Sequence, residues 1–232
     1  MPRKDRGVVM KYSDLYLKIK STKYNESGND VDWSIFVSDA DKIVFLLFKC
    51  TDSDYDWKIN FKFPCIMYKN KLMRVHKGYA TTYKTANDHI LTEFIKCVDT
   101  YPEYKVVIAG WSYGGAMAIL AAEDFNYRTR TDKNDVNSGK KATLITYGCP
   151  RIIGSSKGRK YVKSTITDDS KQFANRFDIV THVVPFFWYR HICVVKLEKN
   201  YIINLWRIFR PHKYEHVKYD EIIIKNNKDG II

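Results

Sequence analysis

Residues 105–125 read KVVIAGWSYGGAMAILAAEDF, and this stretch decides the fold of the chain. It begins with a short apolar run, residues 106–109, which is the pattern of a strand buried on both faces. After Gly110-Trp111-Ser112-Tyr113-Gly114 comes a run of small and apolar residues, 115–122, with a strong preference for helix. The stretch therefore predicts a buried strand, a tight turn at Ser112 and a helix.

Ser112 stands at the centre of a Gly-x-Ser-x-Gly pattern between that strand and that helix. This arrangement is typical of a nucleophile elbow, in which the serine sits on a sharp, strained turn and only small residues fit two positions before and after it. The backbone N–H groups of the following helical turn favour a developing negative charge. The same pattern also occurs by chance in an ordinary turn with an exposed serine. The buried strand before it and the alanine-rich helix after it favour the nucleophile interpretation.

The composition predicts a globular protein with one sizeable core. The chain has 232 residues, of which 45% are hydrophobic and 28% charged. Apolar runs such as residues 43–48 are too short to span a bilayer, and no apolar signal segment follows the basic N-terminus. The five cysteines are scattered without a CxxC pair, which argues against a disulfide framework and a zinc site. We expect a single domain over residues 1–232, located in the cytoplasm or elsewhere inside the cell, with no cofactor and no metal.

The net charge of +13 leaves three alternatives open: nucleic acid, an anionic membrane surface, or no specific partner. Lysine and arginine are spread along the whole chain and no known nucleic-acid motif is present, so we expect no nucleic-acid partner. A solvated basic surface is the simplest interpretation. Peripheral contact with an anionic membrane surface is the second.

Strands alternate with helices along the chain, which predicts an α/β fold with parallel central strands. Strands are expected at residues 33–37, 42–49, 56–63, 106–109, 142–147 and 172–177, and a hairpin at 191–197 and 201–209. Helical patterns cover residues 8–19 and 80–98, the second stopped by Tyr101-Pro102. Residues 127–141 and 152–170 are expected to be loop or irregular, and a helix or strand at 219–224 to be followed by polar disorder.

Functional residues in such sheets lie where strands end at their carboxyl edge, as Thr51, Ser112 and Asp178 do. A nucleophilic serine needs a histidine to take its proton and a carboxylate to orient that histidine, in the chain order Ser, Asp or Glu, His. Asp178 is the best acid because it is a lone carboxylate among apolar residues, although Asp is also common in turns and helix caps. Chain order alone does not choose among the four later histidines, which are His182, His191, His212 and His216.

Several motifs together resemble the class 3 lipase family of α/β-hydrolases, typified by fungal triacylglycerol lipases. The matching stretches run in family order from about residue 43 to residue 219: VFLLFKCTDSDYDW at 44–57, VHKGY at 75–79, the elbow within 102–118, TYGCPR at 146–151, the Asn-x-x-Asp stretch at 175–185 and YRH at 189–191.

The resemblance implies an α/β-hydrolase fold, a mostly parallel sheet flanked by helices, and a role for individual residues. Ser112 would be the nucleophile, Asp178 the acid and His216 the base, because His216 stands in the family's His-x-x-Tyr context. His212 is the alternative base. The oxyanion hole would use Thr51 and the backbone N–H of Tyr113.

The expected function is hydrolysis of carboxylic esters of lipids, acylglycerol or phospholipid, through an acyl-enzyme on Ser112. The alternatives are an esterase for small non-lipid esters and an inactive hydrolase fold that serves as a basic membrane- or protein-binding module. The chain departs from the family at Lys49-Cys50, Trp111 and Tyr113, and shows no long amphipathic lid helix. The pocket is expected to be partly lined by aromatic residues, namely Trp57, Phe61, Phe63, Phe186, Phe187 and Trp188.

Overall fold

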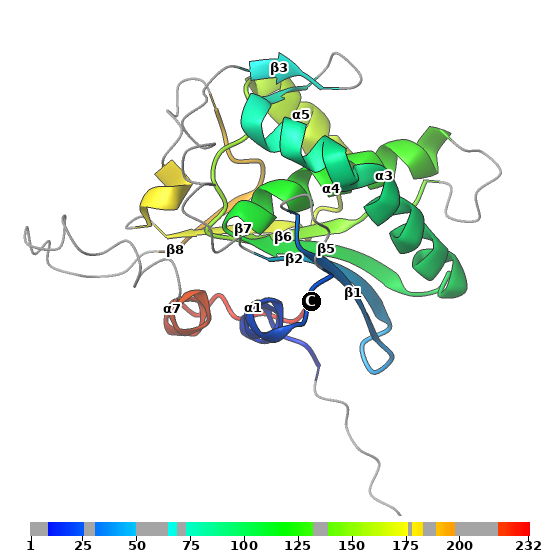
Figure 1. The fold of residues 1–232 in the computed structure, drawn as a ribbon. Coiled ribbons are helices and arrows are strands. Elements are labelled where there is room, and N and C mark those ends of the chain that lie inside the picture. Colours follow the sequence, from blue (N-terminus) through cyan, green and yellow to red (C-terminus); the bar gives the residue numbers. More distant parts are fainter. Residues whose placement is uncertain are drawn as a thin grey trace, which may run out of the picture.

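The structure is a computed structural model of the chain, and it describes residues 9–25, 31–49, 65–68, 73–131, 139–175, 178–182, 189–197 and 218–232. Its centre is a six-stranded sheet in the order β1-β2-β5-β6-β7-β8 (Figure 1). The strands are β1 Trp33–Ser38, β2 Ile43–Phe48, β5 Lys105–Trp111, β6 Thr143–Tyr147, β7 Lys171–Asn175 and β8 Val194–Leu197. Only the β1–β2 pair of this sheet is antiparallel, which confirms the predicted α/β fold with a mostly parallel sheet.

Helices cover both faces of the sheet (Figure 1). On one face lie α3 Lys77–Thr100, α4 Tyr113–Thr131 and α5 Ser156–Thr165, beside a small second sheet of β3 Cys65–Met67 and β4 Arg74–His76. On the other face lie α1 Tyr12–Ser21 and α7 Tyr219–Lys225. A short 3-10 helix, η1 Ile179–His182, follows β7.

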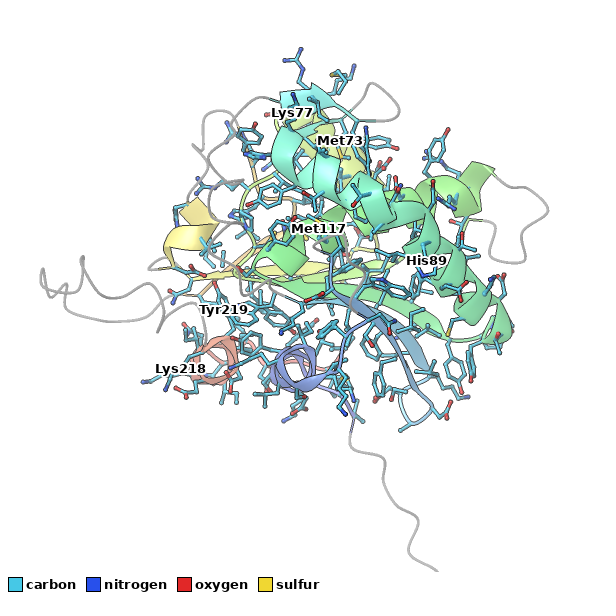
Figure 2. The ribbon with its side chains drawn as sticks, viewed as in Figure 1. Met73, Lys77, His89, Met117, Lys218 and Tyr219 are labelled. Carbon is cyan, nitrogen blue, oxygen red and sulfur yellow. The ribbon has the colours of Figure 1, made fainter. Side chains whose placement is uncertain are left out.

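The apolar strand residues feed two separate cores. All six residues of β2 are buried, and they alternate between the faces: Val44 and Leu46 join the core under α3 and α4, and Phe45 joins the core under α1 and α7. Figure 2 shows side chains filling both layers, with Met117 of α4 on one side of the sheet and Tyr219 of α7 on the other. No helix among the described residues is long and apolar enough to cross a membrane.

Two predictions about irregular segments are wrong. Helix α4 continues through residues 127–131, which were expected to begin a loop, and α5 lies inside the stretch 152–170. The start of α5 is fixed by Ser155, whose Oγ accepts a hydrogen bond of 2.9 Å from the Gly158 amide. Val162 and Thr165 are buried on its inner side. The expected strand at residues 56–63 and the second hairpin strand at 201–209 lie outside the described residues.

The predicted disorder after residue 224 is also wrong. The chain after α7 is tied to α1: Asp229 accepts hydrogen bonds of 2.9 Å from both the backbone N–H and the hydroxyl of Ser13. The Gly230 carbonyl accepts one of 3.1 Å from the Tyr12 amide, and the Ile232 amide donates to the Met10 carbonyl at 3.1 Å. The two ends of the described chain therefore form one layer under the sheet.

Candidate active site

Ser112 occupies the sharp turn between β5 and α4 that the sequence predicts. Its φ angle is 57°, in the left-handed region, and its exposure is only 6%. A non-glycine residue held in this region costs on the order of 1–2 kcal/mol, which the surrounding structure must offset. Tyr113 follows as the first residue of α4, so its N–H begins the helical turn next to the serine.

The glycines on either side of Ser112 are required by close backbone contacts. A Cβ on Gly110 would lie 2.2 Å from the Gly114 carbonyl oxygen. A Cβ on Gly114 would lie 2.4 Å from the Phe48 carbonyl oxygen at the end of β2. Both contacts are to backbone atoms that cannot move aside, so the turn exists only with glycine at both positions.

Backbone hydrogen bonds connect the ends of three neighbouring strands. The Ser112 amide donates to the Tyr147 carbonyl at 2.8 Å, which joins the turn to the end of β6. The Gly148 amide donates to the Phe173 carbonyl at 3.0 Å, which joins β6 to β7. Because β5, β6 and β7 are parallel, the residues that follow them emerge at the same edge of the sheet. Ser112 and Asp178 both lie at this edge.

Asp178 is fully buried in the turn after β7. Its amide donates to the Asn175 carbonyl at 3.1 Å, and its Oδ1 accepts a hydrogen bond of 2.9 Å from the Val180 amide at the start of η1. This second contact is the turn-capping role that the sequence offered as an alternative. It uses one carboxylate oxygen, and each carboxylate oxygen can accept more than one bond.

The other carboxylate oxygen faces Tyr219, a partner that sequence reasoning missed. The Tyr219 hydroxyl donates to Asp178 Oδ2 at 2.7 Å and accepts a hydrogen bond of 3.2 Å from the Asn175 amide. Burial, and then the nearby charge of Asp178, raise the pKa of Tyr219 well above its usual value, so the hydroxyl keeps its proton and remains a donor. The only signal in the sequence was the His-x-x-Tyr context, which gave the tyrosine no role.

Two of the four candidate histidines lie close to the turn that holds Asp178. His182 Nδ1 is 3.0 Å from the Asp178 backbone oxygen and 2.8 Å from the Thr181 hydroxyl. His191 Nε2 lies 3.2 Å from the Thr181 carbonyl oxygen, to which it donates. Burial, and then the charge of Arg151, lower the pKa of His191 to about 4, so its ring is neutral near pH 7. Both rings thus contact the backbone of the turn.

The remaining predicted site residues, Thr51, His212 and His216, lie outside the described residues, as do the aromatic residues expected to line the pocket. Within the part of the chain that the structure describes, no group of three or more His, Cys, Asp or Glu is placed to hold a metal ion. What the described geometry brings together is a strained serine and a buried, hydrogen-bonded carboxylate at one sheet edge. Such a pair can serve acyl transfer once a histidine stands between them.

Residues 45–188 match the sequence model of a protein family described as Lipase (class 3). Similar curated proteins include a lipase of Rhizomucor miehei, 29% identical over 157 residues, which are 67% of this chain and 41% of that protein. A lipase of Rhizopus oryzae is 30% identical over 165 residues, which are 71% of this chain and 40% of that protein. The match thus spans about two fifths of the length of these relatives.

Solved structures share the fold. Lipase II from Rhizopus niveus aligns with a TM-score of 0.65 and 27% identity, over 77% of this chain and 66% of that chain. A triacylglycerol lipase whose catalytic centre is described as a serine protease triad aligns with a TM-score of 0.64 and 26% identity, over 74% of this chain and 63% of that chain.

Proposed function

The chain belongs to the class 3 lipase family, and from this premise we propose that it hydrolyses carboxylic esters of lipids through an acyl-enzyme on Ser112. The observation that carries the proposal is the backbone of Ser112, which is held at a φ of 57°. Close contacts with backbone atoms allow only glycine at Gly110 and Gly114, on either side of this serine. A strained turn of this kind persists only where the structure enforces it, and such strain is concentrated at functional sites. An ordinary surface serine needs none of these constraints.

In the proposed reaction the Ser112 hydroxyl attacks the ester carbonyl, and His216 takes its proton. The carbonyl oxygen becomes negatively charged and accepts hydrogen bonds from the N–H of Tyr113 and from Thr51. His216 then protonates the departing alcohol, which leaves the acyl group on Ser112. Water activated by the same histidine releases the acid and restores the serine. Loss of one oxyanion donor would cost about 2.7–4 kcal/mol of transition-state stabilisation.

Asp178 would orient His216 and stabilise its positive charge during the reaction. Its burial and its hydrogen bonds from Val180 and Tyr219 support this role, because they hold the carboxylate in one orientation. We assign Tyr219 as a positioning residue, since it acts on the reaction only through Asp178. His182 and His191 are not proposed as the base, because their contacts are to the backbone and hydroxyl of the turn.

The relatives support a lipid ester as the substrate class. Several are named lipases, and those of Penicillium camembertii and Gibberella zeae are named secreted mono- and diacylglycerol lipases. We therefore propose an acylglycerol or a phospholipid as the substrate of this chain. Peripheral contact with an anionic lipid surface, expected from the net charge of +13, stays a prediction; sedimentation with anionic but not zwitterionic vesicles would test it.

The test is hydrolysis of p-nitrophenyl esters from acetate to palmitate, and of emulsified acylglycerol, by the parent chain and by Ser112→Ala. Ser156→Ala, an exposed serine at the start of α5, is the matched control. We expect Ser112→Ala to lose at least about a thousandfold in kcat and the control to keep the parent rate. Activity on long chains supports a lipase, and activity confined to acetate and butyrate supports the small-ester alternative. A parent chain inactive on every ester would overturn the proposal in favour of a binding module.

A further inference from the structure

The net charge of the chain is concentrated in two stretches of its sequence. Residues 57–87 and 136–167 contain no aspartate or glutamate, yet they carry 14 of the 39 lysines and arginines. The rest of the chain holds the other 25 basic residues and all 26 acids, so its net charge is −1. The charge of +13 therefore comes from these two acid-free stretches, although basic residues occur along the whole chain.

The fold brings the two acid-free stretches together. The first contains β3, β4 and the start of α3, and the second contains α5. The Gly154 amide, just before α5, donates to the Arg74 carbonyl of β4 at 2.7 Å. A Cβ on Gly158 of α5 would lie 3.5 Å from the Cα of Met73, so the helix packs closely on the residue before β4. Figure 1 shows α5 and β3 on the same side of the molecule, and Figure 2 places Lys77 there, near Met73.

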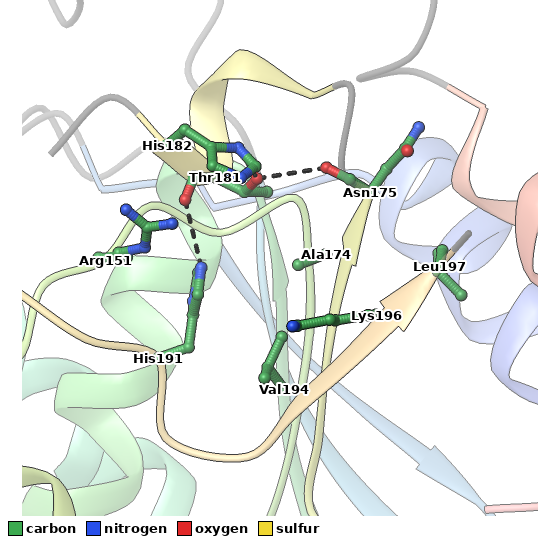
Figure 3. A pocket seen from close by; sticks show the side chains of 9 residues that line it. All are labelled: Arg151, Ala174, Asn175, Thr181, His182, His191, Val194, Lys196 and Leu197. Carbon is green, nitrogen blue, oxygen red and sulfur yellow. Dashed lines mark hydrogen bonds between the residues drawn. The ribbon is translucent and has the colours of Figure 1, made fainter. Parts of the chain in front are cut away.

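Six exposed cations form the outer surface of this region, which we call the basic face: Arg74, Lys77, Lys157, Arg159, Lys160 and Lys163. Among the described residues, none of the six forms an ion pair. In α5 the buried residues Gly158, Val162 and Thr165 lie on the opposite side of the helix from these cations. Arg151, from the second stretch, is not part of the basic face because it lines a hollow beside His191 (Figure 3).

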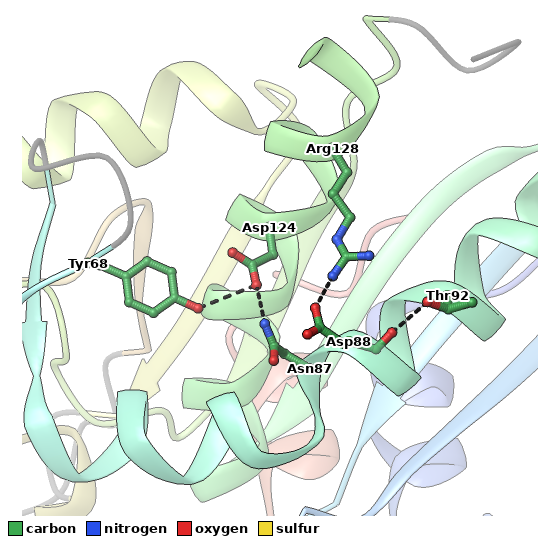
Figure 4. Close-up of polar contacts among 6 residues, drawn as sticks. All are labelled: Tyr68, Asn87, Asp88, Thr92, Asp124 and Arg128. Carbon is green, nitrogen blue, oxygen red and sulfur yellow. Dashed lines mark hydrogen bonds and ion pairs between the residues drawn. The ribbon is translucent and has the colours of Figure 1, made fainter. Parts of the chain in front are cut away.

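Carboxylates of the neighbouring helices do not neutralise the basic face. Glu123 and Asp124 of α4 are both buried, and the Tyr161 hydroxyl of α5 donates to Glu123 at 3.0 Å. Asp88 of α3 pairs with Arg128 of α4, which balances its charge (Figure 4). The cations of the basic face therefore keep a positive field that favours a negatively charged partner.

Helix α5 carries its cations where they disfavour a helix. Its first turn has no acidic residue and contains Lys157, and Arg159 and Lys160 follow in the next turn. The N-terminus of a helix has a partial positive charge, so basic side chains there are repelled. A sequence that breaks such a local rule is expected at a functional site. An anionic partner at this end of α5 would remove the repulsion.

An apolar side chain lies beside these cations. Met67 of β3 is paired with Arg74 in the two-stranded sheet, so both side chains are on the same side of it, and Met67 is 46% exposed. Tyr68 and Met73, the next pair, are buried, so the other side of this sheet faces the core. A soluble anion gains nothing from an exposed methionine. A membrane surface offers phosphate groups and, just beneath them, apolar chains.

The segment that carries Arg74 and Lys77 also reaches the turn at Ser112. The ring of Tyr79, two residues after Lys77, packs on the ring of Tyr113, with 5.4 Å between the ring centroids. Tyr113 directly follows Ser112. A surface that binds the basic face is therefore connected to the candidate active site by a single pair of packed rings.

We propose that the basic face docks the chain on a membrane surface rich in anionic phospholipid, with Met67 entering the apolar layer. The choice of a lipid surface rests on the proposed function, because a hydrolase of lipid esters takes its substrate from such a surface. The lysines and arginines of α5 and β4 bind the phosphate groups, and Met67 adds an apolar contact that is independent of charge.

The experiment measures cosedimentation of the full chain with vesicles of ether-linked phospholipids, which ester hydrolysis cannot consume. The vesicles are phosphatidylcholine alone or with about one third phosphatidylserine. The double variant Lys157→Glu with Lys160→Glu reverses two charges of the basic face, and Met67→Ser removes the apolar contact. Lys23→Glu with Lys228→Glu is the matched control, because it makes the same change in net charge at exposed residues beyond the ends of α1 and α7.

We expect the parent chain to bind the anionic vesicles at least about tenfold more tightly than phosphatidylcholine alone, with a difference that shrinks as salt is added. The variant of Lys157 and Lys160 should bind about tenfold more weakly or worse, Met67→Ser about threefold more weakly, and the control less than about threefold more weakly. Equal loss in the control, equal binding to both vesicles, or binding unaffected by the changes to the face would each overturn the proposal. Tighter binding to single-stranded DNA than to anionic vesicles would assign the face to nucleic acid and overturn it as well.

Hydrolysis of p-nitrophenyl butyrate without vesicles separates this proposal from the proposed function. If the parent hydrolyses the ester but the variant of Lys157 and Lys160 binds vesicles like the parent, the docking proposal fails and the proposed function stands. If the chain hydrolyses no ester but vesicle binding depends on Lys157 and Lys160, the basic face is a membrane-docking surface and the enzymatic function fails.

Discussion

Replacing Tyr219 by phenylalanine tests how the candidate acid is held in place. The change keeps the ring that packs against Tyr16 and Tyr147 and removes only the hydroxyl. That hydroxyl takes part in two hydrogen bonds, as donor to Asp178 Oδ2 at 2.7 Å and as acceptor from the Asn175 amide at 3.2 Å. Asp178 and Asn175 are both fully buried, so water does not readily replace the lost partner.

The two lost bonds set the expected magnitude. A hydrogen bond to a charged group contributes about 1.5–3 kcal/mol, and a neutral one to a backbone N–H about 1 kcal/mol. We therefore expect Tyr219→Phe to lower the free energy of unfolding by about 2.5–4 kcal/mol, a large part of the roughly 5–15 kcal/mol that stabilises a domain. Lower activity on esters should accompany the loss, since the orientation of Asp178 is less restricted.

The assay is urea unfolding at pH 7, followed by circular dichroism, with activity measured on the same preparations. Tyr147→Phe is the matched control: this tyrosine is equally buried in the same cluster, but its hydroxyl donates to the uncharged Tyr12 carbonyl. The control should lose about 1 kcal/mol. A double-mutant cycle of Tyr219→Phe with Asp178→Asn then isolates the contact between the two side chains, with an expected coupling of about 1.5–3 kcal/mol.

Two results would refute this reasoning. If Tyr219→Phe is no more destabilising than Tyr147→Phe, the charge of the acceptor adds nothing. If the coupling energy in the cycle is below about 0.5 kcal/mol, the hydroxyl does not act on the carboxylate, and its role as a positioning residue fails.

Two further predictions concern the glycines of the turn at Ser112 and the stability of the folded chain at acidic pH. Gly110→Ala would place a Cβ 2.2 Å from a backbone oxygen and should lower the free energy of unfolding by more than about 3 kcal/mol or prevent folding. In Gly139→Ala the new Cβ meets no atom within 4 Å, so this control should lose only about 1 kcal/mol, because of its φ of 79°. Equal thermal stabilities of the two variants would contradict this prediction. His191 has its pKa lowered from 6.5 to about 4, so its neutral form contributes up to about 3 kcal/mol of stability that is present above pH 6.5 and lost as the pH falls toward 4. Between pH 7 and pH 4.5, the free energy of unfolding in urea should fall less in His191→Gln than in the parent chain. Equal decreases in the two proteins would exclude the effect.

The parts of the fold that sequence predicts well are those with a strong local pattern. The continuous apolar runs at β2, β5 and β6 indicate buried strands, and the long stripe of apolar residues in α3 indicates an amphipathic helix. Helix α5 was not predicted because its buried side consists of Gly158, Val162 and Thr165, which give almost no apolar periodicity. Its Ser155 cap is a short-range signal that carries weight only when a helix is already expected.

The candidate site shows the same difference between features with a local sequence pattern and features that depend on tertiary contacts. Ser112 was predictable because its flanking glycines are a local requirement of the turn, and the structure gives their reason in backbone contacts. Asp178 was predictable from its motif, but its partner Tyr219 lies 41 residues further along the chain. No local pattern records a hydrogen bond between a loop and a helix that meet only through tertiary packing. The roles of Ser112, Asp178, Thr51, Tyr113 and His216 stay predictions.

The proposed nucleophile and the proposed acid are held by different parts of the molecule. Ser112 is fixed by backbone contacts of β5, β6 and the start of α4, whereas Asp178 is held by backbone bonds within its own turn and by the Tyr219 side chain from α7. Helix α7 packs on α1, and the segment after it is anchored by Asp229 to Ser13. We therefore expect a change that loosens this distant contact to weaken the hydrogen bond from Tyr219 to Asp178 before it affects the turn at Ser112. The layer of α1 and α7 thus contributes the Tyr219 contact to Asp178, at the sheet edge where Ser112 also lies.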